Sequence, residues 1–218
     1  MASWPHDGAL QAVNLARRAK VSAYVVAAVY SGLLFVFNVT VPSLVHRVGS
    51  ALPLAVVVAF TLFDNWLWHV GPCPRLAKRP DLRGTWLGEL NSYWRDERDE
   101  LHSDSREVAL VIREDYTTVS VTLLSPESKS LSSAAEIVEL QPADFALMYQ
   151  YQNTPALPYR RRSPIHSGGA TVSFAGYRPG RLSGEYWTAR DSRGVFTVEL
   201  ANREIAGTFD EAKAMRGN

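Results

Sequence analysis

The chain has 218 residues and an ordinary overall composition, with 46% hydrophobic residues, 21% charged residues and a net charge of +1. This average hides two unlike parts, because residues 1–79 carry a net charge of +5 and residues 80–218 carry −4. An acidic second part argues against a general nucleic-acid binder, which would carry basic patches. The one cysteine, Cys73, excludes an intramolecular disulfide.

Two long apolar segments come first. Residues 21–41 contain no charged residue, and twenty-one helical residues span roughly 30 Å, the thickness of a bilayer core. Residues 48–70 are uncharged until Asp64 and end in a cluster of aromatic side chains, which is typical of a membrane interface. A buried globular helix and a signal peptide are alternatives for the first segment, but its length and the second run behind it favour a membrane span. We therefore predict a transmembrane helical hairpin over residues 21–70.

Basic residues gather before the first apolar segment and after the second. They are Arg17, Arg18, Lys20, Arg75, Lys78, Arg79 and Arg83. Because lysine and arginine are enriched in cytoplasmic loops, we expect both termini in the cytoplasm and a short external loop near residues 42–49. Residues 1–20 then form a cytoplasmic segment, and residues 71–80, with three prolines, form a linker.

Small residues recur at four-residue spacing along both apolar segments. The first contains Ala23 and Ala27, and the second contains Ala51, Ala55 and Ala59. Such ridges let helix backbones approach closely in lipid. They are consistent with packing of the two helices within one chain and with packing between chains, and the two arrangements are compatible.

From residue 81 the hydrophobic pattern changes to an alternation of period two, which is typical of strands. Turn residues separate eight predicted strands, near residues 82–92, 106–115, 117–125, 128–140, 144–153, 168–177, 181–190 and 194–203. Eight consecutive antiparallel strands in residues 81–218 predict a closed up-and-down β-barrel, with a sandwich as the alternative. The predicted fold is therefore membrane-anchored all-β: two N-terminal transmembrane helices followed by a compact eight-stranded antiparallel barrel. Helical character returns only near the C-terminus.

Polar and aromatic residues share faces of three predicted strands, and the face of residues 144–153 grades from apolar to aromatic and polar. The candidate ligand-binding residues on these faces are Ser130, Tyr149, Tyr151, Asn153, Tyr186, Thr188 and Arg190. If the faces point inward, the barrel has a polar mouth above an apolar floor, which is the layout of a small-molecule site. The alternative is that these groups only hydrogen-bond one another.

Enzyme signatures are missing from the sequence, which has no phosphate loop, no Gly-x-Ser-x-Gly elbow and no dinucleotide fingerprint. The five histidines show no metal-ligand spacing. We therefore expect a binding protein that is not an enzyme and needs no metal or cofactor. The charged run 95–107 is expected to form a solvated hairpin tip. The basic triplet Arg160–Arg162 either contacts phosphate or anionic lipid or forms a surface loop.

The order of motifs behind the two apolar segments resembles that of a known family. The motifs comprise Gly84, Trp86 and Gly88, then Ser128, Ser130 and Ser132, then Tyr149, Tyr151, Asn153 and Pro155, then His166 and Gly168, then Gly184, Tyr186 and Arg190. They resemble the two-transmembrane β-barrel effectors of bacterial cyclic-oligonucleotide-based antiphage signalling (CBASS), the CD-NTase-associated 2TM/β-strand-rich family. The resemblance covers nearly the whole chain after residue 20.

The resemblance implies a mechanism and partners. A nucleotidyltransferase activated by infection makes a cyclic dinucleotide, and the barrel binds it. The effector then self-associates through its transmembrane helices in the bacterial inner membrane and disrupts the lipid bilayer. In this setting the tyrosines would stack on bases, and Ser130 and Asn153 would bond base edges or phosphate oxygens. Arg190, the one arginine on a predicted inward face, would pair with a phosphate.

Two other functions are compatible with the sequence. A membrane-tethered, lipocalin-like barrel would bind a lipid or another hydrophobic small molecule, although the polar face of residues 149–153 counts against this. A purely structural interaction module would have its barrel plugged by its own side chains. In every case Trp86 is expected to fill the floor, while Gly84 and Gly88 let the first strand bend as the sheet closes.

Overall fold

The architecture is given by a computed structural model that describes residues 23–30, 32, 44–96 and 98–217. The chain divides into two units, Met1–Cys73 and Pro74–Asn218, and each is described by itself.

The described residues of the first unit are helical apart from the turn residues 66 and 70–72. Residues 23–30 and 32 are helical, α2 spans Leu44–Asn65, and the short 3-10 helix η1 spans Leu67–His69. The predicted segment 1–20 and most of the predicted span 21–41 lie outside the described residues. Within the described part of the chain, no helix combines the length and the apolar character needed to cross a membrane. The membrane anchor stays a prediction.

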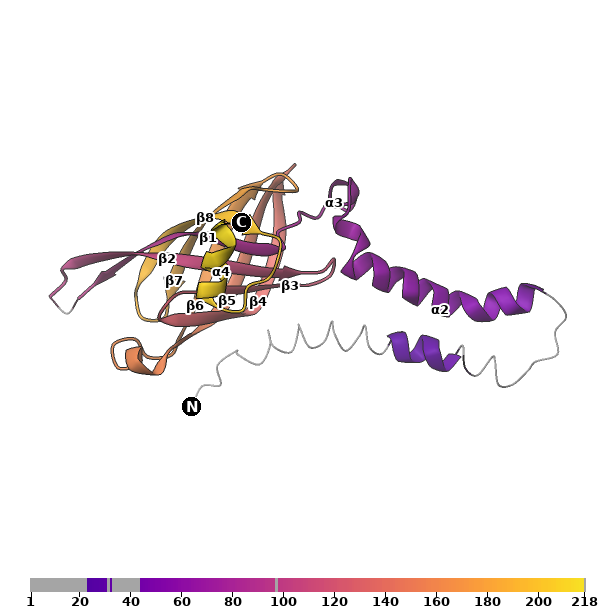
Figure 1. Cartoon of the computed structure of the whole chain (residues 1–218), viewed down its shortest axis with the longest axis horizontal. Helices are drawn as coiled ribbons and strands as arrows, with labels where there is room; N and C mark the ends of the chain where they lie inside the picture. The colour runs from indigo at the N-terminus through magenta and orange to yellow at the C-terminus, as the bar shows by residue number, and fades with distance from the viewer. Residues whose placement is uncertain (1–22, 31, 33–43, 97, 218) are drawn as a thin grey trace. The chain divides into compact units, whose positions relative to one another are not determined.

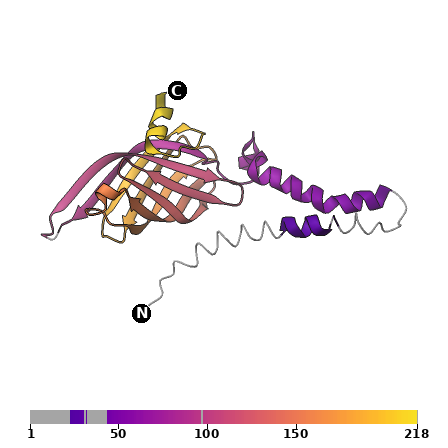
Figure 2. The same ribbon diagram turned by 60° about the horizontal axis from the view of Figure 1, so that its bottom comes forward.

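The second unit begins with the end of α3 (Cys73–Leu76) and then forms one closed barrel. Its strands are β1 (Gly84–Arg95), β2 (Leu101–Glu114), β3 (Val119–Leu124), β4 (Ser128–Gln141), β5 (Asp144–Pro155), β6 (His166–Ala175), β7 (Arg181–Thr188) and β8 (Arg193–Asn202). Each strand pairs with the next, and β1 pairs with β8 to close the ring (Figures 1 and 2). The predicted eight-stranded up-and-down barrel is confirmed, and the sandwich is excluded.

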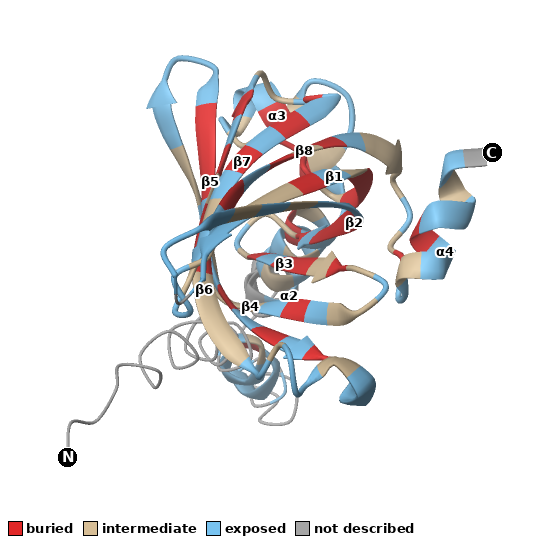
Figure 3. Ribbon diagram, turned by 90° about the vertical axis from the view of Figure 1, so that its left-hand side faces the viewer, coloured by how far each residue is buried: buried red, intermediate tan, exposed pale blue. Residues whose placement is uncertain are grey.

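Alternate residues of the strands point into the barrel, and Figure 3 shows the resulting stripes of buried positions. In β5, the residues Phe145, Leu147, Tyr149, Tyr151 and Asn153 are all buried, as the sequence alternation predicted. The end of the barrel near the start of β1 is apolar, with Leu82, Trp86, Leu110, Ile112, Val121, Phe145, Leu147, Val172, Leu182 and Val198 in the core. This apolar end forms the floor of the barrel.

The Gly84-x-Trp86-x-Gly88 motif lies at the seam between β1 and β8. Trp86 is fully buried in the floor, and its Nε1 donates a hydrogen bond to the carbonyl of Leu82 at 2.9 Å. Gly84 has a φ of 141°, a conformation that side chains disfavour. A Cβ at Gly88 would collide with the carbonyl oxygen of Thr197 on β8. The motif therefore permits the close approach that closes the barrel.

The segment before β1 is fixed to the floor end of the barrel. Arg79 Nε lies 3.1 Å from Glu114 Oε1, and the backbone N–H of Leu82 donates to Glu114 Oε2 at 2.9 Å. Arg203 donates to the carbonyl and to the carboxylate of Asp81 at 3.1 and 3.3 Å. The last residues of the predicted linker and the first residues of the predicted barrel domain are thus held by the ends of β2 and β8.

The β1–β2 hairpin is longer than predicted. β1 continues to Arg95, and β2 begins at Leu101. Residues 101–108 pair with β1 alone, because the pairing between β2 and β3 begins at Ala109. This part of the hairpin projects from the barrel (Figure 1). The run 95–107 forms the outer end of this hairpin, and its described residues are exposed or half-buried, as expected. Cross-strand pairing continues through most of the run, so the turn itself is shorter than expected.

The C-terminal helix α4 (Phe209–Ala214) packs on the outside of the barrel and is followed by the 3-10 turn η3 (Met215–Gly217). Ala206 and Ala212 join Leu87, Ala109 and Val111 in a second, smaller apolar cluster. Thr208 caps the helix by accepting a hydrogen bond from the N–H of Glu211 at 3.2 Å. The helical character predicted for the C-terminus is confirmed.

The seam between β1 and β8 yields a stability prediction. Gly88→Ala forces a methyl group against the β8 backbone, and we expect it to lower the free energy of unfolding by about 1–3 kcal/mol. Gly180→Ala is the matched control, because a Cβ at Gly180 meets no atom within 4 Å. Thermal unfolding of the full chain in detergent micelles measures both variants. Equal melting temperatures for the two would contradict the close approach.

Candidate functional site

The barrel opens, at the end opposite the floor, into a cavity of about 710 Å³. This volume lies within the range of roughly 300–1,000 Å³ that is usual for small-molecule sites. Leu90, Val108 and Phe196 are among the apolar residues at its base, and serines, arginines and carboxylates surround its mouth. The predicted layout of a polar mouth above an apolar floor is confirmed.

All seven predicted site residues line this cavity. Ser130 comes from β4, Tyr149, Tyr151 and Asn153 come from β5, Tyr186 and Thr188 come from β7, and Arg190 comes from the turn after β7. The closed topology brings β4, β5 and β7 to one enclosed space, since the inner faces of all eight strands meet there. Their role in binding remains a prediction.

Ser130 and Asn153 form a buried polar pair in the wall. They lie opposite each other in the β4–β5 register, and Ser130 Oγ donates to Asn153 Oδ1 at 2.9 Å. Among the described residues, none accepts a hydrogen bond from Asn153 Nδ2. The pair therefore offers the side-chain N–H groups of Asn153 to a ligand.

Three tyrosines form the aromatic wall of the cavity. The rings of Tyr149 and Tyr151 lie 6.0 Å apart, centroid to centroid. Tyr186 donates to Ser92 Oγ at 2.6 Å, whereas the Tyr149 hydroxyl has no hydrogen-bond partner in the part of the chain that the structure describes. Burial raises the pKa of all three hydroxyls above the usual value, so they are neutral donors at physiological pH. The wall can therefore stack on planar groups and donate hydrogen bonds.

Arg190 does not share a strand face with Tyr186, contrary to the prediction. β7 ends at Thr188, whose Oγ1 accepts from the backbone N–H groups of Arg190 and Ser192, each at 3.2 Å. Such local side-chain bonds compete with strand pairing and end the strand early. The exposed guanidinium of Arg190 donates to Ser163 Oγ at 3.0 Å and to the carbonyl of Arg162 at 3.3 Å. Arg190 thus lines the mouth from a turn.

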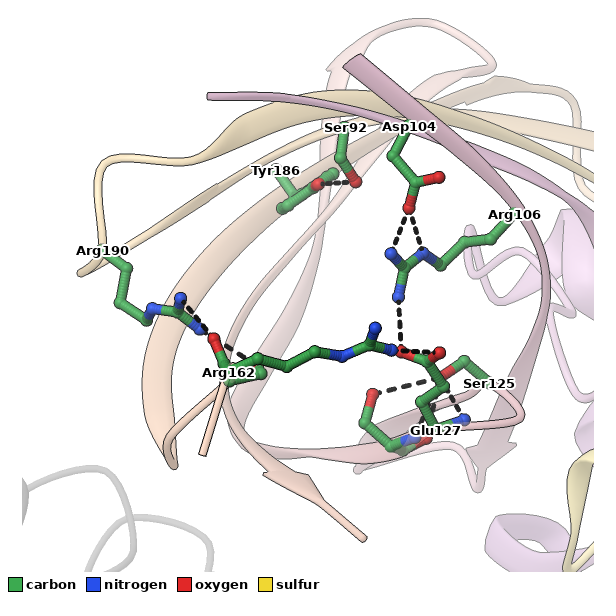
Figure 4. A network of polar contacts seen from close by, with 10 residues as sticks. Ser92, Asp104, Arg106, Ser125, Glu127, Arg162, Tyr186 and Arg190 are labelled. Carbon is green, nitrogen blue, oxygen red and sulfur yellow. Dashed lines mark hydrogen bonds and ion pairs between the residues drawn. The ribbon is translucent and has the colours of Figure 1, made fainter. Parts of the chain in front are cut away.

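Two arginines and two carboxylates at the mouth were not among the predicted site residues. For one of them, Arg162, contact with phosphate was one of the alternatives given for the triplet Arg160–Arg162, and the structure places it in the cavity lining. Arg106 Nε donates to Asp104 Oδ2 at 3.1 Å, and Arg106 Nη1 donates to Glu127 Oε2 at 3.4 Å. Arg162 forms an ion pair with the other oxygen of Glu127 (Figure 4). Asp104 and Arg106 continue the inward alternation of Val108 and Leu110, which is the signal that would have found them.

Other charged groups gather at the tip of the β1–β2 hairpin. Asp96, Glu100 and His102 each offer a ligand atom within 4.8 Å of the others. His102 Nε2 lies 3.0 Å from Asp96 Oδ2, and Asp96 Oδ1 accepts from the backbone N–H of Glu100 at 3.0 Å. The hydrogen bond with His102 is the largest cause of the lowered pKa of Asp96. These bonds account for the cluster as a hairpin-tip structure.

Comparison with known proteins identifies the barrel. A family model described as Cap15, cyclic dinucleotide receptor domain, matches residues 77–200, which is more than half of the chain and includes β1 to β7 with most of β8. The chain belongs to this family. The match confirms the resemblance to CBASS effectors, and the barrel is a cyclic dinucleotide receptor domain.

A curated relative agrees with the family assignment. The chain is 23% identical over 170 residues to CD-NTase-associated protein 15 of Staphylococcus schleiferi. The aligned region covers 76% of this chain and 88% of that protein.

The Ser130–Asn153 pair yields a second stability prediction. Ser130→Ala leaves the buried Oδ1 of Asn153 without its donor, and we expect a loss of roughly 1–3 kcal/mol in the free energy of unfolding. Ser133→Ala is the control, because its hydroxyl on the same strand makes only a 3.4 Å contact with the carbonyl of Gln150. Denaturant unfolding of the full chain compares them. A Ser130→Ala variant as stable as the control would show that the pair does not stabilise the wall.

Proposed function

We propose that the cavity binds a cyclic dinucleotide with the phosphates at the arginines of the mouth and the bases against the tyrosine wall. The observation that carries the proposal is the convergence of three guanidinium groups above a buried aromatic wall. Arg106, Arg162 and Arg190 supply the charge, from three separate elements. Tyr149 and Tyr151 supply flat apolar surface beside polar groups.

The chemistry of a cyclic dinucleotide matches this arrangement. Its two phosphates carry two negative charges, and guanidinium groups bind phosphate through paired, charge-assisted hydrogen bonds. Base stacking on an aromatic side chain contributes ~1–3 kcal/mol per base. Asn153 and Ser130 lie within the same cavity and can bond base edges or phosphate oxygens. The two arginines that the sequence analysis had not assigned to the site supply the positive charge that Arg190 alone lacks.

The proposed output is membrane damage. Ligand binding shifts the chain from dispersed to clustered in the bacterial inner membrane, with both termini in the cytoplasm, and clustering through the apolar helices disrupts the bilayer. A ligand can drive this change only if it binds the clustered state more tightly than the dispersed state. No chemistry on the ligand is involved, so the protein acts without catalytic residues, metal or cofactor. The name of the relative, CD-NTase-associated protein 15, supports a nucleotidyltransferase as the source of the ligand.

Binding by the full chain in detergent micelles tests the site. We expect a member of a cyclic dinucleotide panel to raise the melting temperature by mass action. Arg106→Ala should weaken binding by about 10- to 150-fold, since hydrogen bonds to charged groups contribute ~1.5–3 kcal/mol. Arg113→Ala is the matched control, because Arg113 lies on the outer face of the same strand.

The same panel includes fatty acids, because the alternative function is that of a lipocalin-like barrel that binds a hydrophobic molecule. A melting-temperature rise with a fatty acid and with no cyclic dinucleotide would replace the proposed function by that one. If Arg106→Ala and Arg113→Ala weakened cyclic dinucleotide binding equally, the assignment of the phosphate site would be wrong.

Clustering tests the proposed output. We expect Tyr151→Ala and Arg190→Ala to abolish ligand-dependent clustering of the full chain in liposomes, because the first removes a proposed base contact in the wall and the second a proposed phosphate contact at the mouth. Chemical crosslinking measures clustering, and circular dichroism checks that the barrel remains folded. Arg193→Ala is the control for charge, since Arg193 is exposed at an outward position of β8. Unchanged clustering in both site variants would overturn the link between the cavity and assembly.

A further inference from the structure

Glu127 holds both of the newly found arginines of the mouth. Its carboxylate lies in the cavity lining, with Oε2 3.4 Å from Arg106 Nη1 and Oε1 paired with Arg162 Nη2 (Figure 4). The turn between β3 and β4 fixes the residue in place. Ser125 Oγ accepts from the backbone N–H groups of Glu127 at 3.3 Å and Ser128 at 3.0 Å. The carboxylate is thereby presented to two guanidinium groups that come from distant parts of the chain.

A carboxylate that bridges two guanidinium groups makes the same kind of contact as a phosphate. Both are anionic oxygen acceptors that fit the forked donors of arginine. A phosphate bound to Arg106 and Arg162 would use the donors that Glu127 now engages. The carboxylate and a phosphate therefore compete for one place at the mouth.

We propose that Glu127 is an internal competitor that sets which anions the mouth accepts, because a ligand must displace its carboxylate from Arg106 and Arg162. The inference rests on the proposed function and names how the site selects its ligand. The ion pairs are exposed enough to break, since the side chains of Glu127, Arg106 and Arg162 are 31%, 40% and 63% exposed. Ion pairs at such exposure are weak.

The charges of the mouth favour an anionic ligand. Four arginines, Arg95, Arg106, Arg162 and Arg190, line the cavity with two carboxylates, Asp104 and Glu127. Displacement of Glu127 frees the donors of Arg106 and Arg162 for the phosphates of a ligand. Asp104 stays on Arg106 and keeps its guanidinium in place. The exchange therefore favours a ligand whose phosphates engage both Arg106 and Arg162 over one whose anionic group reaches a single guanidinium.

Glu127 also connects the mouth to the loop after β5. Its carbonyl accepts from the N–H of Ala156 at 2.8 Å, and its carboxylate holds Arg162, whose guanidinium lies 4.9 Å from the ring centre of Tyr159. Arg190 holds the same loop through Ser163 and the carbonyl of Arg162. Displacement of the carboxylate thus exchanges one of the side-chain contacts of this loop for a contact with the ligand.

The test compares Glu127→Gln with Glu107→Gln in the full chain. Both substitutions remove one negative charge and keep the side-chain size. Glu107 neighbours Arg106 on β2 but points outward, where it pairs with Lys213 at 2.8 Å and with Arg216 at 3.7 Å. Titration calorimetry in detergent micelles measures two probes, the tightest cyclic dinucleotide of the panel and inorganic pyrophosphate.

We expect Glu127→Gln to tighten binding of both probes by about 2- to 30-fold, the range given by two exposed ion pairs, and Glu107→Gln to leave it near the wild-type value. In an Arg162→Ala background the gain from Glu127→Gln should shrink, because one of the two competing contacts is already gone. Circular dichroism and thermal unfolding check that each variant folds.

Equal or weaker binding by Glu127→Gln than by Glu107→Gln overturns the inference, and so does a gain that Arg162→Ala leaves unchanged. Failure of the proposed function has a different signature. A wild-type chain that binds pyrophosphate but no cyclic dinucleotide contradicts the nucleotide site, while the pyrophosphate comparison still decides the role of Glu127. Variants and wild type that bind neither probe overturn both.

Discussion

The close approach of β1 to β8 is the constraint on which the rest of the structure depends. Gly88 leaves room for the carbonyl of Thr197, and the seam can therefore close. Closure gives every strand two partners and turns eight inner faces into one enclosed space. Trp86 and its neighbours fill that space at the floor, so only the opposite end remains open for a ligand.

The distribution of charged groups in the barrel follows from the same enclosure. A charged group deep in the barrel would lose its hydration without an equal return, so the inner wall carries neutral groups. The buried tyrosines stay protonated, and Ser130 supplies the donor for the buried Oδ1 of Asn153. In the part of the barrel that the structure describes, arginines and carboxylates lie at its two ends. Glu114 pairs with Arg79 at the floor end, and the charged groups of the mouth are stabilised by water and by one another. The ordering from apolar floor through neutral polar wall to charged rim is what makes the mouth suited to a ligand with flat bases and anionic phosphates.

The alternation of apolar and polar residues was enough to predict the barrel and the inward face of β5. A strand with one face in the core carries buried residues at every second position, and this repeat can be read in the sequence. The same reasoning missed Arg106, since the outer half of the hairpin is polar on both faces and reads as a solvated tip. Arg162 and Glu127 lie in a loop and a turn, where no period exists. Their meeting depends on closure, which brings segments 35 residues apart into one ion pair. The sequence analysis placed Arg190 on a strand because the alternating pattern does not reveal the hydrogen bonds of Thr188 that end β7.

The entry of the chain into the barrel constrains how a bound ligand can act on the rest of the protein. Arg79, Leu82 and Asp81 are held at the floor end, by Glu114 and Arg203, whereas the cavity opens at the other end of the same strands. The cavity is therefore remote from the segment before β1 and from the contacts that fix it. The groups at its open end are the rim residues and the loop held by Glu127 and Arg190. A change confined to this rim and loop leaves the floor as it is, and it is therefore the response to a ligand that demands the least rearrangement of a closed and well-packed core.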